Sequence, residues 1–163
     1  MNENNILAVI LAGGKSKRFG QEKSQVKLGD KTLLEHSLSK LKSKFDKILI
    51  VTNNNTIKDY TTINDCIDGQ LGPLVGVLSA MKWIKKNSFS YNWIATFPCD
   101  TPFFNISIIE EFFKASKLND NLLYFVKSNE KRHNIFGLWS LKLIEILEKD
   151  IIENNYRKVE KWA

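Results

Sequence analysis

The chain has 163 residues, of which 43% are hydrophobic and 26% charged, as is typical of one globular domain with a sizeable core. No apolar run approaches the length of a membrane span, and the first residues, MNENN, do not resemble a signal peptide, so we expect a cytoplasmic protein with no membrane segment. The net charge of +6 comes mainly from lysines scattered along the chain rather than from one basic face with interleaved aromatics, which argues against nucleic-acid binding.

Apolar runs typical of buried strands alternate with apolar residues at helical spacing. In chain order they predict strand Ile6–Leu11, helix Thr32–Leu41, strand Lys47–Thr52, helix Leu74–Ile84, strand Trp93–Phe97, helix Ile106–Phe113 opening near a cap at Asn105, strand Leu122–Val126, a weaker strand near Ile135–Trp139, and helix Leu141–Ile152. This alternation predicts an α/β fold with a mostly parallel central sheet and helices on both faces. With no repeat or linker, we expect one domain over residues 1–163, whose two cysteines, Cys66 and Cys99, are buried free thiols.

A glycine-rich basic loop, GGKSKRFG, follows the first predicted strand. Its glycine spacing fits neither the G-x-G-x-x-G dinucleotide fingerprint nor a Walker A loop. Glycines let the backbone approach a ligand, while Arg18 can bond phosphate oxygens through a planar fork and Lys23 adds a point charge. Taken alone, such a loop is more often a solvated lysine-rich turn than a phosphate site.

Two further loops favour the phosphate site. Asp100 follows the strand Trp93–Phe97, where a carboxylate suits a Mg²⁺ shared with the phosphates of a nucleotide, although an Asx-turn would also explain it. Asp65 precedes GPLVG, residues 72–76, a glycine-bounded start of a helix that allows close approach of an anion or a flat base. Because the carboxyl ends of parallel strands meet at one edge of a sheet, the three loops are expected to form one site.

The segments LAGGKSKRFGQEK, GPLVGVLSAM and FPCDTPFF together resemble the molybdenum cofactor guanylyltransferase (MobA) family of nucleotidyltransferases, over Ile6 to about Lys158. The first segment marks only the broad group with an LAGG-x5-G-x2-K loop, whereas the pairing of GPL-x-G with PCDTP is more specific. His133, before an apolar strand, and the later segment YRKV, residues 156–159, also resemble the family. The resemblance implies a three-layer, Rossmann-like nucleotidyltransferase fold.

The resemblance also implies roles for residues at the strand ends and at the start of the second helix. The implied nucleotide-binding residues are Leu11, Ala12, Gly13, Gly14, Lys23, Asn53, Asp65, Gly72, Pro73 and Asp100. Arg18, Lys23 and Asp100 would be the catalytic residues, and Asp100 would also bind the Mg²⁺ cofactor. The implied reaction is attack by the terminal phosphate of molybdopterin on the α-phosphorus of GTP, which forms the guanine dinucleotide cofactor and releases pyrophosphate.

The chain departs from the family pattern in three places. Lys158 stands where a second arginine is expected, and Asn134 where the family has proline. The sequence stops at Ala163, before an N-x-N-T segment that supplies a further metal-side ligand, so we expect a domain that lacks the family's C-terminal segment.

The implied partners are GTP and the molybdopterin cofactor, with transient contact to proteins that make the cofactor or receive it. Two alternatives remain open. One is a related transferase that uses CTP or makes a nucleotide sugar, and the other is a nucleotide-binding module with impaired catalysis.

Overall fold

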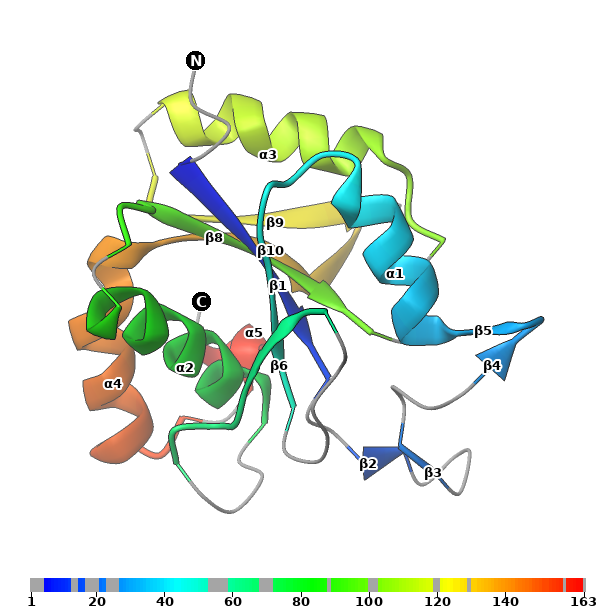
Figure 1. The fold of residues 1–163 in the computed structure, drawn as a ribbon. Helices are drawn as coiled ribbons and strands as arrows, with labels where there is room; N and C mark the ends of the chain where they lie inside the picture. Colours follow the sequence, from blue (N-terminus) through cyan, green and yellow to red (C-terminus); the bar gives the residue numbers. More distant parts are fainter. Residues whose placement is uncertain are drawn as a thin grey trace.

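A six-stranded sheet, in the order β7-β6-β1-β8-β10-β9, runs through the molecule (Figure 1). The computed structural model describes residues 5–12, 15–16, 21–22, 27–52, 59–67, 72–87, 89–99, 103–118, 121–128, 130–156 and 158–162. The strands of the main sheet are β1 (Ile6–Leu11), β6 (Ile48–Val51), β7 (Thr61–Ile63), β8 (Trp93–Pro98), β9 (Leu123–Ser128) and β10 (Lys131–Ser140). The helices are α1 (Leu33–Lys42), α2 (Pro73–Lys86), α3 (Ser107–Leu118), α4 (Ile144–Ile152), which follows the 3-10 turn η3 (Leu141–Leu143), and α5 (Val159–Trp162).

The sheet is mostly parallel, as the alternation of strands and helices predicts. Strand β1 pairs in parallel with β6 and with β8, and β6 pairs in parallel with β7. Strand β10 is antiparallel to both β8 and β9. All the parallel strands therefore point their carboxyl ends toward the same edge, which is where an open α/β sheet binds its ligands.

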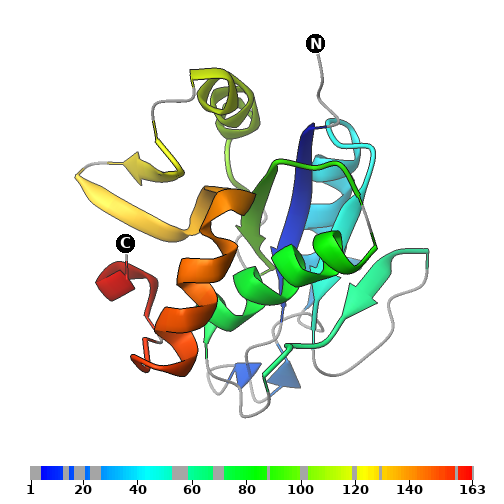
Figure 2. The ribbon, with the colours of Figure 1, turned by 90° about the vertical axis from the view of Figure 1, so that its left-hand side faces the viewer.

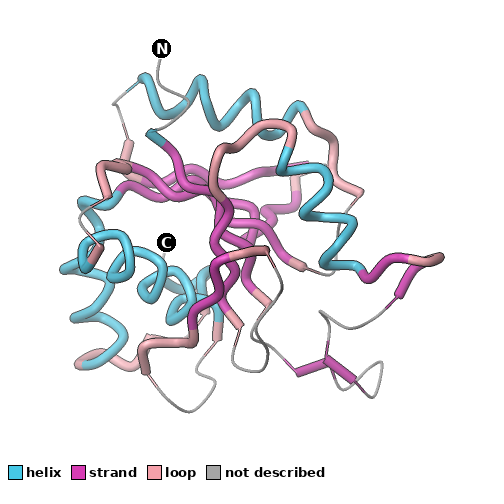
Figure 3. Tube along the Cα trace, viewed as in Figure 1, coloured by secondary structure: helices cyan, strands magenta, loops and turns pink. Residues whose placement is uncertain are grey.

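Helices cover both faces of the sheet and give the molecule three layers (Figures 1 and 3). On one face α1 and α3 pack through leucine and phenylalanine side chains such as Leu38 and Phe112. On the other face α2, α4 and α5 pack through side chains such as Leu78, Leu147 and Val159. Figure 2 shows α2 and α4 side by side, and an ion pair between Lys82 and Glu148 joins them. The hydrogen bond that the Lys82 ammonium donates to the Glu148 carboxylate raises the pKa of Lys82.

A buried hydroxyl group fastens β10 onto β8. Thr96 is 0% exposed, and its Oγ1 donates to the carbonyl oxygen of Ile135 at 2.6 Å. The same oxygen accepts the indole N–H of Trp139 at 3.0 Å and the backbone N–H of Gly137 at 3.2 Å. These bonds span the irregular stretch of β10 between His133 and Gly137, where its register with β9 shifts. Thr96 therefore supplies hydrogen bonds to backbone groups of β10 at the point where its pairing with β9 is irregular.

The end of the chain packs against the sheet through an aromatic contact. The ring of Trp162 in α5 stacks on Trp139, with the ring centroids 6.1 Å apart. Its indole N–H donates to the carboxylate of Asp150 at 2.7 Å, and Val159 is buried. A short helix that is marginal alone is thus held by tertiary contacts.

Several boundaries differ from the sequence prediction. His133 lies inside β10 rather than before it, and α2 begins at Pro73, one residue before the predicted start. Strand β7 and the two hairpins β2–β3 (Lys15–Ser16, Gln21–Glu22) and β4–β5 (Lys27–Leu28, Lys31–Thr32) were not predicted, because none of them has an apolar run of strand length. The expectation of two buried thiols is wrong for Cys66, which is exposed, and right for Cys99. Within the described ranges, no helix is both long enough and apolar enough to cross a membrane.

Candidate functional site

The carboxyl edge of the sheet, at the lower side of Figure 1, brings predicted site residues together. Directly after β1, the backbone N–H of Ala12 donates to the carbonyl oxygen of Val51 at 2.8 Å. Directly after β6, the N–H of Thr52 donates to the carbonyl oxygen of Ile63 at 2.9 Å. The parallel ladder thus continues one residue beyond each strand and fixes the backbone just before the glycine loop.

Helix α2 begins at the same edge, because it follows β7 in the chain and runs back along the sheet. Gly72, its N-cap, has a φ of 96°, in the left-handed region that favours glycine, and Pro73 occupies the first turn. The N-cap makes no side-chain hydrogen bond to the helix. The first backbone N–H groups of α2 therefore have no side-chain cap and could bind an anionic or polar ligand.

At Gly76, helix α2 lies close to the end of β1. A Cβ atom at this position would be 2.9 Å from Cδ2 of Leu11 and 3.8 Å from Oδ1 of Asp65. It would also be 3.8 Å from Cγ1 of Val51. Leu11, Asp65 and the GPLVG segment, three features singled out in the sequence, therefore meet at one point.

Ser79 of α2 binds the segment before the helix, which contains Asp65, through a hydrogen bond. Its Oγ accepts the backbone N–H of Cys66 at 2.7 Å and donates to the carbonyl oxygen of Val75 at 2.6 Å. Ser79 is 3% exposed. Sequence reasoning missed this residue, although a serine on an otherwise apolar helix face, one turn after Gly76, was the available signal.

We expect Gly76→Ala to weaken nucleotide binding and to leave the stability of the protein little changed. Helix propensity alone predicts a gain of about 1 kcal/mol for alanine. The contact at 2.9 Å opposes this gain, because Cδ2 of Leu11 must move away from the new methyl group. Thermal unfolding and nucleotide titration of the variant check both effects, and a more stable variant with unchanged affinity would contradict the close approach.

The described residues on either side of Asp100 are held by the surrounding structure. Before it, β8 ends at Pro98 and Cys99 is buried. After it, the ammonium of Lys40 on α1 donates to the carbonyl oxygen of Phe104 at 2.5 Å and lies 4.6 Å from the centroid of the Phe104 ring.

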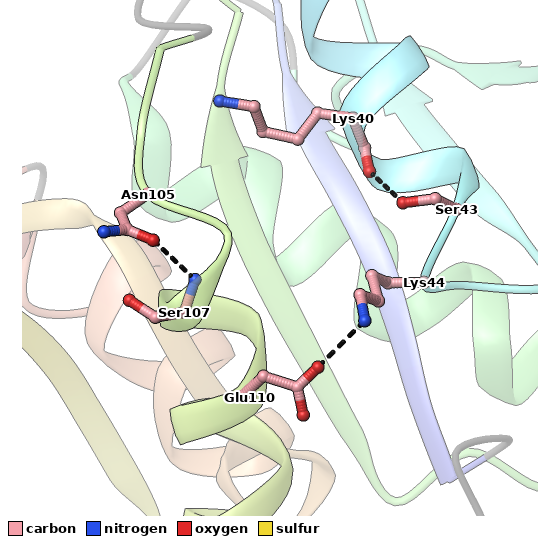
Figure 4. A network of polar contacts seen from close by, with 6 residues as sticks. All are labelled: Lys40, Ser43, Lys44, Asn105, Ser107 and Glu110. Atoms are coloured by element: carbon pink, nitrogen blue, oxygen red, sulfur yellow. Dashed lines mark hydrogen bonds and ion pairs between the residues drawn. The ribbon is translucent and has the colours of Figure 1, made fainter.

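The same segment is attached to helix α3 (Figure 4). The side-chain oxygen of Asn105 accepts the N–H of Ser107 at 2.9 Å, which supports the predicted cap at this position. Lys44, just after α1, forms an ion pair with Glu110 of α3 at 3.0 Å. The described residues before and after Asp100 are therefore fixed to the framework of strands and helices.

The remaining predicted site residues lie outside the described residues. They are Gly13, Gly14, Arg18, Lys23, Asn53 and Asp100. In the part of the chain that the structure describes, no group of three histidine, cysteine, aspartate or glutamate side chains could hold a metal ion. The phosphate loop and the metal ligand therefore stay predictions from the sequence.

His133 lies at the same edge of the sheet, since β10 runs opposite to β8 and begins where β8 ends. Its Nε2 is 2.6 Å from Oγ of Ser128 on β9, and its ring packs edge-on against Phe136. Among the residues of the YRKV segment, Lys158 is exposed and Val159 is buried. Val159 belongs to the buried cluster that also contains side chains of α2 and α4.

Comparison with known proteins shows the family of the chain. Residues 8–162 match the family described as the MobA-like NTP transferase domain. A Haemophilus influenzae protein named molybdenum cofactor guanylyltransferase is 32% identical over 160 residues, which cover 95% of this chain and 81% of that protein. A Rhizobium johnstonii protein of the same name is 29% identical over 159 residues, covering 98% and 75% of the two chains.

Solved structures share the fold. The molybdopterin-guanine dinucleotide biosynthesis protein A of Archaeoglobus fulgidus superposes with a TM-score of 0.77 at 21% identity, over 95% of this chain and 77% of that chain. The bifunctional IspDF of Campylobacter jejuni superposes with a TM-score of 0.66 at 14% identity, over 96% of this chain and 46% of the other. At these identities the likeness extends to the fold alone.

Proposed function

The chain belongs to the MobA-like NTP transferase family and is a nucleotidyltransferase, and from this premise we propose that it transfers GMP from GTP to a molybdopterin-type molybdenum cofactor. The names of the curated relatives support this donor and this acceptor. The observation that carries most weight is the meeting of Leu11, Asp65 and Gly76 at the carboxyl edge of the sheet. We also infer transient contacts with the proteins that make or receive the cofactor.

The base of the nucleotide would lie between the end of β1 and the start of α2. The fixed backbone after Leu11 offers polar groups on one side, and the bare backbone at Gly72 allows close approach on the other. Asp65 adds a carboxylate that can accept hydrogen bonds. Guanine suits such an acceptor because its Watson–Crick edge carries two neighbouring donors, the ring N1–H and the exocyclic amino group on C2.

The triphosphate would lie along the glycine loop. Gly13 and Gly14 would offer backbone N–H groups, while Arg18 and Lys23 would neutralise charge on the phosphate oxygens. Mg²⁺ bound by Asp100 would supply further charge neutralisation at the α-phosphate. Because Cys99 and Phe104, on either side of Asp100, are fixed, the carboxylate would keep its position as the substrates react.

The reaction needs no nucleophile from the protein. A terminal phosphate oxygen of molybdopterin forms the new bond to the α-phosphorus of GTP, and the bond from that phosphorus to the bridging oxygen of the β-phosphate breaks. The leaving group is pyrophosphate, which takes the electron pair. The work of the protein is alignment of the two substrates and stabilisation of the charge on the moving oxygens.

We expect GTP to bind at least tenfold more tightly than CTP, ATP or UTP in the presence of Mg²⁺, a difference of about 1.4 kcal/mol. The reason is the acceptor set around Asp65, which matches the donors of guanine better than those of the other bases. Calorimetric titration with the four nucleotides measures the preference.

Two outcomes of that titration would favour the alternatives. Equal or tighter binding of CTP would replace the guanine assignment with a CTP-using transferase. Binding of GTP without release of pyrophosphate, when molybdopterin is present, would instead identify a nucleotide-binding module that does not catalyse transfer.

A further inference from the structure

Among the described large apolar side chains, that of Phe103 is the most exposed, at 68%. It comes three residues after Asp100, at the carboxyl edge of the sheet. The next residue, Phe104, is by contrast buried and stacks on Phe97 of β8, with ring centroids 5.3 Å apart. The chain therefore turns one aromatic ring into the core and presents the adjacent ring to solvent.

Neighbouring residues hold the exposed ring in place. The ring of His36 on α1 packs against Phe103, with centroids 5.7 Å apart and an interplanar angle of 50°. Nε2 of His36 is in turn 2.8 Å from the carbonyl oxygen of Leu28 in the β4–β5 hairpin. On the other side, Lys40 bonds the carbonyl oxygen of Phe104. An exposed ring fixed in this way is suited to stacking, because little conformational freedom is lost when a ligand binds.

The ring lies on the side of the sheet opposite to the base of the nucleotide. In the proposed function, the base lies beside Gly76 and Asp65, on the face covered by α2. Phe103 contacts α1, and Phe104 packs into the core on the face covered by α1 and α3. Because the donor occupies one side of the edge, the acceptor must approach the α-phosphorus from elsewhere along that edge.

We propose that Phe103, backed by His36, stacks on the planar ring of the acceptor substrate, an inference that rests on the proposed function. A pterin offers a flat heteroaromatic face, and such rings stack well on exposed aromatic side chains. Leu28, which is 47% exposed, adds an apolar rim. Lys27 precedes Leu28, and Lys31 pairs with Leu28 across the hairpin. Both lysines are exposed and can form ion pairs with the phosphate of the acceptor.

The test is a binding titration of the full chain with the phosphate ester of 6-hydroxymethylpterin, followed by quenching of the pterin fluorescence. Phe103→Ala should raise the dissociation constant of this probe about tenfold, whereas Phe103→Trp should keep the wild-type value. Leu118→Ala is the matched control, because Leu118 is 64% exposed and lies at the far end of α3. The affinity for GTP should be the same in all four proteins.

A second variant checks the support of the ring. His36→Gln keeps an amide donor near the position of Nε2, within reach of the Leu28 carbonyl oxygen, but removes the imidazole that packs on Phe103. This variant should raise the dissociation constant of the probe less than Phe103→Ala does. In the transfer assay both variants should raise KM for molybdopterin while kcat changes by less than about threefold, since neither residue touches the α-phosphate.

The outcomes separate this inference from the proposed function. If the wild type transfers GMP to molybdopterin and Phe103→Ala leaves both the probe affinity and KM unchanged, the stacking role is overturned and the function stands. If the wild type neither binds the probe nor accepts molybdopterin, both are overturned. A wild-type dimer that dissociates on Phe103→Ala, with unchanged probe affinity, would assign the ring to a contact between two copies of the chain.

Discussion

Replacing Asp100 with asparagine is expected to reduce nucleotidyl transfer by about 100-fold or more, while the thermal stability stays nearly intact. A carboxamide keeps the shape of the side chain but removes the charge that would bind Mg²⁺. The fold should tolerate the change because the turn is held by its flanks, with Cys99 buried before it and Phe104 bonded to Lys40 after it. Affinity for GTP should fall only modestly, since Leu11, Gly72 and the glycine loop still hold the nucleotide.

The measurement is the Mg²⁺-dependent rate of pyrophosphate release from GTP and molybdopterin, together with the melting temperature. Asp46→Asn is a suitable control, because Asp46 is an exposed carboxylate just before β6, at the opposite edge of the sheet. An Asp100→Asn variant with full Mg²⁺-dependent activity would show that Asp100 only shapes its own turn, since asparagine serves in an Asx-turn about as well as aspartate.

Thr96→Val is expected to lower the free energy of unfolding by about 3 kcal/mol. Valine fills the same space, but the indole N–H of Trp139 loses a buried bond to the hydroxyl and the carbonyl oxygen of Ile135 loses a partly buried one. Each buried polar group without a partner costs about 1–3 kcal/mol. The irregular part of β10 also loses its hydrogen bonds to the Thr96 side chain of β8.

Chemical and thermal unfolding measure the loss, and for a domain of this size about 3 kcal/mol lowers the melting temperature by roughly 6–12 °C. Thr96→Ser retains the hydroxyl and should cost only about 1 kcal/mol for the missing methyl group. Thr62→Val, on the half-buried edge strand β7, should stay within about 0.5 kcal/mol of the wild type. A Thr96→Val variant as stable as Thr96→Ser would mean that packing, and not the hydroxyl, joins the two strands.

The sequence predicts the central elements of the fold because they are the most buried. Ile6–Leu11 is an unbroken apolar run, and it forms the middle strand with its first five residues buried. Strand β7 could not be predicted, because Thr61–Ile63 is short, half-buried and polar in two of its three positions. His133 belongs to β10 through its pairing with Val126 rather than through apolarity, so the pattern places the strand start too late.

The candidate site was predictable where it follows from topology. Leu11, Asp65 and Gly72 lie at strand ends or at a helix start, and the rule for open parallel sheets brings such positions to one edge. The bond from Cys66 to Ser79 and the close approach at Gly76 depend on how α2 packs on β1, which no local pattern specifies. For the same reason the exposure of Cys66 was predicted wrongly.

The position of β1 in the middle of the sheet has a consequence for how the chain folds. Ala8 pairs with Ile48, and Ile6 pairs with Trp93, so both neighbours of the first strand come from much later in the sequence. During synthesis β1 emerges from the ribosome before its partner strands. This apolar run stays unpaired until the α1–β6 segment and later β8 have also emerged. Loop closure over such separations is slow, and an unpaired apolar strand is prone to aggregation. Chaperone capture of the nascent chain should therefore concentrate on its first half, before β8 completes the central sheet.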